Sequence, residues 1–136
     1  MRRTAPKVPL EDDEAVAFAT WLRINHIPST HIANEMGGST KTARLRALKA
    51  KRMGQTAGVW DYEIFIPVKS LITGEVDTYQ EVRVELKRTK GSTTSPAQKE
   101  WGKIYEMAGI PCAICKGAKK AIEFVQSVID EIGGVE

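Results

Sequence analysis

Val82-Arg83-Val84-Glu85-Leu86-Lys87 is a stretch in which apolar and charged side chains alternate at every position. Successive side chains of a β-strand point to opposite faces of the sheet. The alternation therefore predicts a strand whose apolar side chains enter the core and whose charged side chains share the other face. On that face, the Glu85 carboxylate and the Lys87 ammonium stand two residues apart, about 6–7 Å along the strand.

A second candidate strand follows an acidic residue, because Asp61 precedes the apolar stretch Tyr62-Glu63-Ile64-Phe65-Ile66. If the two strands pair, Asp61 and Glu85 can converge on one divalent cation, and Lys87 can face a water bound to it. These groups are the minimum that metal-assisted hydrolysis of a phosphodiester requires. The alternative is an ordinary one, in which Glu85 and Lys87 belong to the solvated face of a half-exposed sheet.

The remaining patterns predict helices that alternate with strands. Apolar residues at helical spacing indicate helices over 11–24 and 118–132. Ser39 or Thr40 can cap a helix that runs to Met53, and Ser95-Pro96-Ala97-Gln98 has the form of a capping box that begins another. Strands are expected over 30–34, 60–68, 80–88 and 110–115, the second and third as a hairpin. This order predicts an α/β fold with helices flanking a mixed sheet.

The composition is that of one soluble domain. The chain has 136 residues, of which 42% are hydrophobic and 27% charged, so it can bury a core of its own. No apolar run approaches the ~20 residues that cross a bilayer, and no apolar segment of a signal peptide follows Met1. We therefore expect a cytoplasmic protein without membrane contact, with residues 1–9 as a flexible arm.

Positive charge is concentrated between Glu35 and Asp61, where no acidic residue occurs. The basic residues of this segment are Lys41, Arg44, Arg46, Lys49, Lys51 and Arg52. Such a patch favours polyanions. We predict that Lys41, Arg44, Lys51 and Arg52 contact DNA, the alternatives being a solvated helix face or a subunit interface.

The two cysteines, Cys112 and Cys115, form a lone Cys-x-x-Cys within a predicted strand. Residues three apart in a strand point to opposite faces. A zinc site would need two further ligands, and the sequence has no second pair. We therefore expect buried core thiols. The lone histidines, His26 and His31, are assigned no role.

Taken together, these residues resemble the PD-(D/E)XK nuclease superfamily and, within it, the small stand-alone VRR-NUC domain of phages and bacteria. The resemblance extends over roughly residues 10–132. The matching residues are Glu11 with Trp21-Leu22, His31 to Glu35, Gly58 to Tyr62, Val84 to Lys87, Ser95 to Trp101, Gly109, and Gly117 to Ala121. The family usually has Pro before its Asp, where Trp60 stands here; that Pro shapes the backbone and carries no chemistry.

The resemblance implies a restriction-endonuclease-like α/β core over 10–136, with a mixed central sheet flanked by helices. It implies that Asp61 and Glu85 bind Mg²⁺ or Mn²⁺, with the Leu86 backbone carbonyl as a further oxygen ligand. Lys87 would orient or help to deprotonate the attacking water and offset phosphate charge.

Two further positions carry implied roles in catalysis. Gln98 would position the scissile phosphate or the Lys87 region from the start of its helix, and the capping function of Ser95-x-x-Gln98 can hold at the same time. Glu11 would hold a second metal ion or its waters. The family often has Gln one turn after this Glu, where the chain has Ala15, so Glu14 remains an alternative to Glu11.

The expected function is that of a metal-dependent DNA endonuclease acting on branched DNA, Holliday junctions in particular. The alternatives are a nuclease directed to flaps or ends, and a DNA-binding protein without catalysis that uses segment 41–52. A four-way junction is resolved by paired cuts related by a two-fold axis, so a resolving enzyme of this size is expected to be a homodimer. Candidate interfaces are the hairpin around Leu71-Ile72-Thr73 and Trp21 on the outer side of the first helix. For both, the alternatives are ordinary core and a lone exposed apolar group.

Overall fold

The computed structural model describes residues 11–32 and 40–133, except for the side chain of Glu11. The elements in chain order are α1 (Glu11–Ile24), β1 (Ser29–His31), α2 (Lys41–Arg52), β2 (Tyr62–Lys69), β3 (Val76–Lys87), α3 (Pro96–Met107), β4 (Cys112–Lys116) and α4 (Ala118–Gly133). This is the predicted order of helices and strands. The predicted arm over 1–9 and the end of the first predicted strand, residues 33 and 34, lie outside the described residues.

The four strands form one mixed sheet in the order β1-β2-β3-β4. β1 pairs with β2 and β2 with β3 in antiparallel orientation, whereas β3 and β4 are parallel. The predicted hairpin is present, but β3 begins at Val76 and not near Gln80. Residues 76–79 are exposed and are part of the strand because they pair with β2. Since none of them enters the core, the sequence shows no alternation of apolar and polar residues there.

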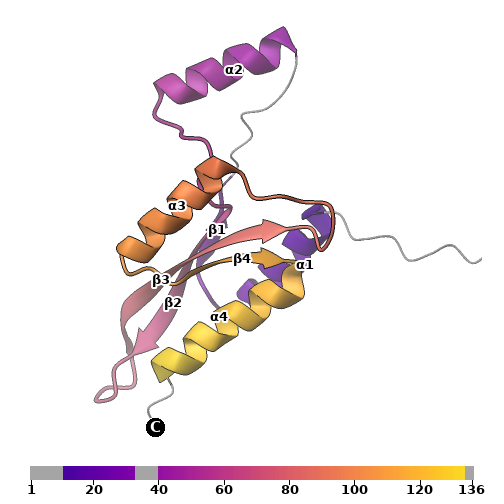
Figure 1. Ribbon diagram of the computed structural model, residues 1–136. Helices are drawn as coiled ribbons and strands as arrows, with labels where there is room; N and C mark the ends of the chain where they lie inside the picture. The colour runs from indigo at the N-terminus through magenta and orange to yellow at the C-terminus, as the bar shows by residue number, and fades with distance from the viewer. Residues whose placement is uncertain (1–10, 33–39, 134–136) are drawn as a thin grey trace, which may run out of the picture.

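The hydrophobic core lies between one face of the sheet and the helices α1 and α4 (Figure 1). Every second residue of β2 and of the end of β3 enters it, as the alternation in the sequence predicts. The largest fully buried side chains are Phe18, Leu22, Ile64, Leu86, Val82, Val84 and Val125. Burying each of them stabilises the fold by roughly 1.5–3 kcal/mol. Helix α3 lies on the opposite face, which carries the charged side chains, and covers part of it.

Helix α2 stands apart from the sheet and from the other helices (Figure 1). Thr40 caps its N-terminus by accepting a hydrogen bond from the Ala43 backbone N–H, and Gly54 follows its end with a φ of 95°. None of its residues is buried, and the apolar seam of Leu45 and Leu48 is exposed. The capping prediction is confirmed, but within the described chain the helix rests on no other element.

The two candidate interface regions differ in exposure. Trp21 is half-buried and packs against the core, so its expected position on the outer side of α1 is wrong. Leu71 and Ile72, in contrast, are each 95% exposed at the tip of the β2–β3 hairpin. Within residues 11–32 and 40–133, no helix is long and apolar enough to cross a membrane.

Candidate active site

Asp61 and Glu85 come together because the antiparallel register of β2 and β3 aligns Tyr62 with Val84, the neighbours of the two acids. The Asp61 backbone N–H donates to Glu85 Oε2 at 3.0 Å, and the Leu86 backbone N–H donates to Asp61 Oδ2 at 3.3 Å. Each carboxylate thus accepts a hydrogen bond from the backbone of the segment that carries the other acid or follows it. The predicted convergence of the two acids is what the strand pairing produces.

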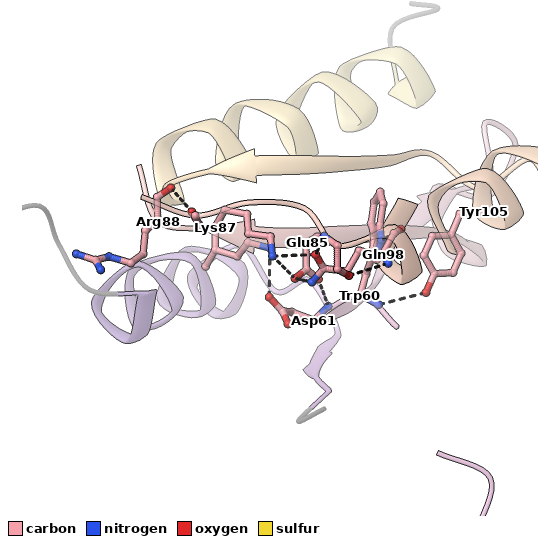
Figure 2. A network of polar contacts seen from close by, with 10 residues as sticks. Trp60, Asp61, Glu85, Lys87, Arg88, Gln98 and Tyr105 are labelled. Atoms are coloured by element: carbon pink, nitrogen blue, oxygen red, sulfur yellow. Dashed lines mark hydrogen bonds and ion pairs between the residues drawn. The ribbon is translucent and has the colours of Figure 1, made fainter. Parts of the chain in front are cut away.

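Lys87 joins this pair from the same face of β3. Its Nζ lies 3.5 Å from Glu85 Oε1 and donates to Gln98 Oε1 at 3.0 Å. The Lys87 side chain is only 13% exposed. Figure 2 shows Glu85, Lys87 and Gln98 turned toward one another, whereas Arg88 extends away from them. The lysine is therefore fixed beside the acids and does not extend freely into solvent.

Gln98 connects the start of α3 to the charged side chains. Its Oε1 accepts from the Ser95 backbone N–H at 3.0 Å and from Lys87 Nζ, while its Nε2 donates to Glu85 Oε1 at 2.8 Å. The amide orientation follows from this chemistry, because the oxygen faces two donors and the nitrogen faces a carboxylate. The capping box is present, and so is the predicted contact with Lys87.

The environment of Glu85 disfavours its negative charge. Burial raises the pKa of this carboxyl to about 7, and the nearby charge of Asp61 adds to the rise. The Asp61 N–H and the Lys87 ammonium act in the opposite direction, but they are weaker. A cation bound between the two carboxylates would offset both causes of the rise. A bound cation would therefore favour the charged form of Glu85.

The donor set suits a hard divalent cation. Asp61 and Glu85 offer carboxylate oxygens, and Leu86 between Glu85 and Lys87 offers a backbone carbonyl, which are the oxygen ligands that Mg²⁺ and Mn²⁺ prefer. The part of the chain that the structure describes contains no group of three or more His, Cys, Asp or Glu side chains that would hold a metal. Two carboxylates from this chain, completed by backbone oxygen and water, fit Mg²⁺ with its tendency to keep water ligands.

The structure describes the side chain of only one of the two acids predicted from the first helix, Glu14. The Glu11 side chain lies outside the described residues. The Glu14 carboxylate accepts a hydrogen bond from the Ala118 backbone N–H at the start of α4, where a negative charge is favoured by the helix dipole. The adjacent Gly117 N–H donates to the Lys87 carbonyl at 2.8 Å, so Glu14 lies near the end of β3. Catalytic roles for Glu11 and Glu14 stay predictions.

Two residues that support the site, Trp60 and Tyr105, were assigned no role in it from the sequence. The Trp60 indole N–H donates to the Gln98 carbonyl at 2.8 Å, and the Trp60 backbone N–H donates to the Tyr105 hydroxyl at 3.4 Å. The two rings meet edge to face at 5.2 Å between centroids. Trp60, the residue before Asp61, is therefore tied to the turn that carries Gln98. Its place in the usual proline position was the only sequence signal.

Glycines allow this close approach of α3 to the Asp61 segment. A Cβ on Gly58 would lie 2.6 Å from the Ala97 carbonyl carbon and 2.8 Å from the Gln98 nitrogen. A Cβ on Gly102 would lie 2.9 Å from Cζ2 of Trp60. Gly58 also has a backbone φ of 86°, a value that residues other than glycine rarely adopt. The absence of a Cβ at both glycines therefore permits the close packing of α3 against segment 58–60.

The other predicted residues lie elsewhere. Lys41, Arg44, Lys51 and Arg52 are exposed on α2. This helix stands apart from the sheet (Figure 1). Cys112 is half-buried and Cys115 is buried, both are free thiols, and burial raises the pKa of each. The expectation of thiols within the fold is thus confirmed for Cys115 and met only in part by Cys112.

The described residues therefore have a nuclease-like α/β fold: a mixed sheet flanked by helices, with two carboxylates and a lysine gathered beside the start of α3. The chain is similar to a solved structure named "VRR_NUC domain protein", at 25% sequence identity and a TM-score of 0.66, over 92% of each chain. This likeness agrees with the family resemblance of the sequence motifs. No protein-family model and no curated protein matches the chain.

Proposed function

We propose that this protein is a metal-dependent nuclease that hydrolyses phosphodiester bonds in DNA. The observation that carries the proposal is the network in which Asp61, Glu85, Lys87 and Gln98 are joined by hydrogen bonds at one end of two paired strands. The likeness to a VRR_NUC domain protein over 92% of both chains supports it, since that name denotes a nuclease domain.

The residues divide the work of hydrolysis between them. Asp61 and Glu85, with the Leu86 carbonyl, would hold Mg²⁺ or Mn²⁺. When bound, the ion would polarise a phosphoryl oxygen and lower the pKa of a bound water. Lys87 places a positive charge beside the same carboxylates, where it orients the attacking water and offsets charge that develops on the phosphate. Gln98 fixes the Lys87 ammonium through its Oε1 and so acts as a positioning residue.

The burial of the charged pair argues against a protein that merely binds DNA. In that alternative, Glu85 and Lys87 form an exposed ion pair, which contributes little to stability. In the structure, the residue Glu85 is 3% exposed and the Lys87 side chain 13%. Holding a carboxylate in this environment costs free energy and raises its pKa. Such an arrangement is typical of functional sites.

For the substrate we propose branched DNA, with the Holliday junction first and flaps or ends as the alternatives. Lys41, Arg44, Lys51 and Arg52 are assigned to the DNA backbone, because α2 presents them in solvent without any acidic neighbour along the helix. A 12-residue helix with no buried side chain has little stability of its own. Contact with a polyanion would stabilise it.

The decisive experiment compares the wild type with Lys87→Ala on junction, flap, nicked and linear duplex DNA in Mg²⁺, Mn²⁺ or EDTA. We expect cleavage by the wild type in Mg²⁺ or Mn²⁺, none in EDTA, and none by Lys87→Ala, whose DNA affinity stays within about 10-fold of wild type because one of many positive charges is lost. The matched control is Lys69→Ala, an exposed lysine at the far end of β2. Full activity of Lys87→Ala would refute the catalytic assignment.

A further inference from the structure

The charged face of the sheet carries three cations near the carboxylates, and they differ in how far they are already neutralised. Arg83 contacts two acids: its guanidinium lies 3.3 Å from Glu63 and 3.0 Å from Glu81. The same guanidinium stacks 5.3 Å above the Tyr105 ring. Lys87 is held by Glu85 and Gln98. The charges of Arg83 and Lys87 are therefore already paired with carboxylates of the fold, and neither is free to bind a phosphate beside the one that is cleaved.

Lys116 is the third cation, and the parallel pairing of β3 and β4 places it beside Lys87. The register aligns Lys87 with Lys116 and Leu86 with Cys115. Cys115 is buried in the core, as Leu86 is, so Lys116 belongs to the opposite face together with Lys87. Neighbouring strands lie about 4.8 Å apart. The two lysines therefore stand side by side at the ends of their strands.

The surroundings of Lys116 leave it accessible. β4 is an edge strand of the described sheet, and Lys116 is exposed. Ile114, which is aligned with Glu85, is 37% exposed, so α3 does not cover this part of the face. Within residues 11–32 and 40–133, Lys116 takes part in none of the ion pairs. No carboxylate of the part of the chain that the structure describes forms an ion pair with it.

We propose that Lys116 binds a backbone phosphate of the DNA strand next to the phosphate that is cleaved, and so sets the path of that strand across the β4 edge. The inference rests on the proposed nuclease function and adds a binding residue to it. The physical reason is charge: a DNA strand adds one negative charge per phosphate to a site whose Lys87 is already paired with Glu85. Within the described residues, Lys116 is the cation next to Lys87 on this face that forms no ion pair with a carboxylate.

The test measures DNA affinity of wild type, Lys116→Gln and Lys116→Arg in EDTA, as a function of salt. Losing one phosphate contact makes the slope of log affinity against log salt less steep by about 0.9. It also weakens binding about 5- to 10-fold at about 0.1 M salt. Lys116→Arg keeps the charge and restores both quantities. Lys69→Gln, the exposed lysine at the opposite end of the sheet, leaves the slope unchanged. In cleavage assays, Lys116→Gln raises KM by a similar factor and changes kcat less.

The outcomes separate this inference from the proposed function. An unchanged salt slope in Lys116→Gln, with an active wild type, overturns the role of Lys116 and leaves the nuclease standing. A wild type that cuts no DNA in any metal refutes the nuclease, while a lowered slope in Lys116→Gln still shows a phosphate contact. A wild type that does not bind DNA overturns both. Failure of Lys116→Arg to restore affinity also counts against a charge contact.

Discussion

At the scale of single residues, the site is organised around one buried carboxylate. Glu85 accepts hydrogen bonds from the Asp61 backbone and from the Gln98 amide, and its Oε1 lies 3.5 Å from Lys87 Nζ. These contacts fix its position but do not overcome the effect of burial, so its pKa stays near 7. A residue of this kind lowers stability in return for a functional geometry.

Glu85 makes the stability of the metal-free protein depend on pH, because its pKa of about 7 in the folded state lies above the ordinary value of 4.5. Stability linked to protonated Glu85 is fully present below pH 4.5 and is lost as pH rises through about 7. We expect this group to lower the free energy of unfolding in EDTA by about 1–3 kcal/mol between about pH 5 and pH 8. Urea unfolding at these values measures the change.

In Glu85→Gln this decrease disappears, so the free energy of unfolding varies less with pH than in the wild type. Glu123→Gln, which removes an exposed carboxylate of α4, is the matched control and keeps the wild-type profile. Parallel profiles for wild type and Glu85→Gln would contradict the assignment of a buried carboxyl group with a raised pKa.

At the scale of elements, the first turn of α3 is the part that must be placed accurately. The capping box defines where the helix begins, and the Trp60 indole fixes that turn to the Asp61 segment. Gly58 and Gly102 permit the close approach. The position of Gln98 is therefore set jointly by a local signal, the cap, and by packing between segments far apart in the chain.

Gly58→Ala should displace this turn. The new methyl group would meet Ala97 and the Gln98 backbone at less than 3 Å, in addition to the strain of about 1–2 kcal/mol that a left-handed residue adds. Gly54→Ala is the matched control: Gly54 also has a positive φ, of 95°, but nothing lies within 4 Å of its Cβ position. We expect a larger loss of melting temperature and of cleavage in Gly58→Ala than in Gly54→Ala. Equal losses would mean that the contact with α3 is unimportant.

Helix α2 is the element with the least support from the rest of the fold. Its basic residues and its Leu45–Leu48 seam are exposed, and no side chain of the helix is buried. Its conformation is set locally by the Thr40 cap and by the glycine after its end. The helix thus presents positive charge at a distance from the face that carries Asp61, Glu85 and Lys87, which suits contact with a long or branched polyanion.

At the scale of the whole molecule, the number of subunits decides how many strands can be cut. One chain carries one Asp61–Glu85–Lys87 site, and paired cuts across a junction require two sites related by a two-fold axis. Leu71 and Ile72, each 95% exposed at the hairpin tip, form an apolar surface available for self-association. We therefore propose a homodimer with this hairpin in its interface.

Sedimentation at micromolar concentration should show a dimer for the wild type, and Leu71→Ser/Ile72→Ser should shift the protein toward the monomer. Both side chains are exposed, so the double variant should keep the melting temperature of the isolated subunit. Junction cleavage on both strands should decrease together with the dimer fraction, whereas nicking of one strand should persist. A monomeric wild type that cuts flaps or ends would favour the alternative substrates.

The sequence alone determined the order of elements and the groups most central to the site. Alternation along 82–87 identifies a strand and its two faces, and the Ser95–Gln98 cap identifies the start of a helix, because both patterns depend on residues close in the chain. The pairing of Asp61 with Glu85 followed from expecting a hairpin, the simplest connection between two adjacent strands.

Only the tertiary structure decided what depends on register and on packing between distant segments. The alignment of Lys116 with Lys87 comes from the parallel pairing of β3 and β4, which no local pattern specifies. The contact of Trp60 with Gln98 joins residues 38 positions apart, and the half-burial of Trp21 depends on where α1 meets the core. Periodicity reveals which face of an element is apolar, but the neighbour that covers each face is chosen by the packing of the whole chain.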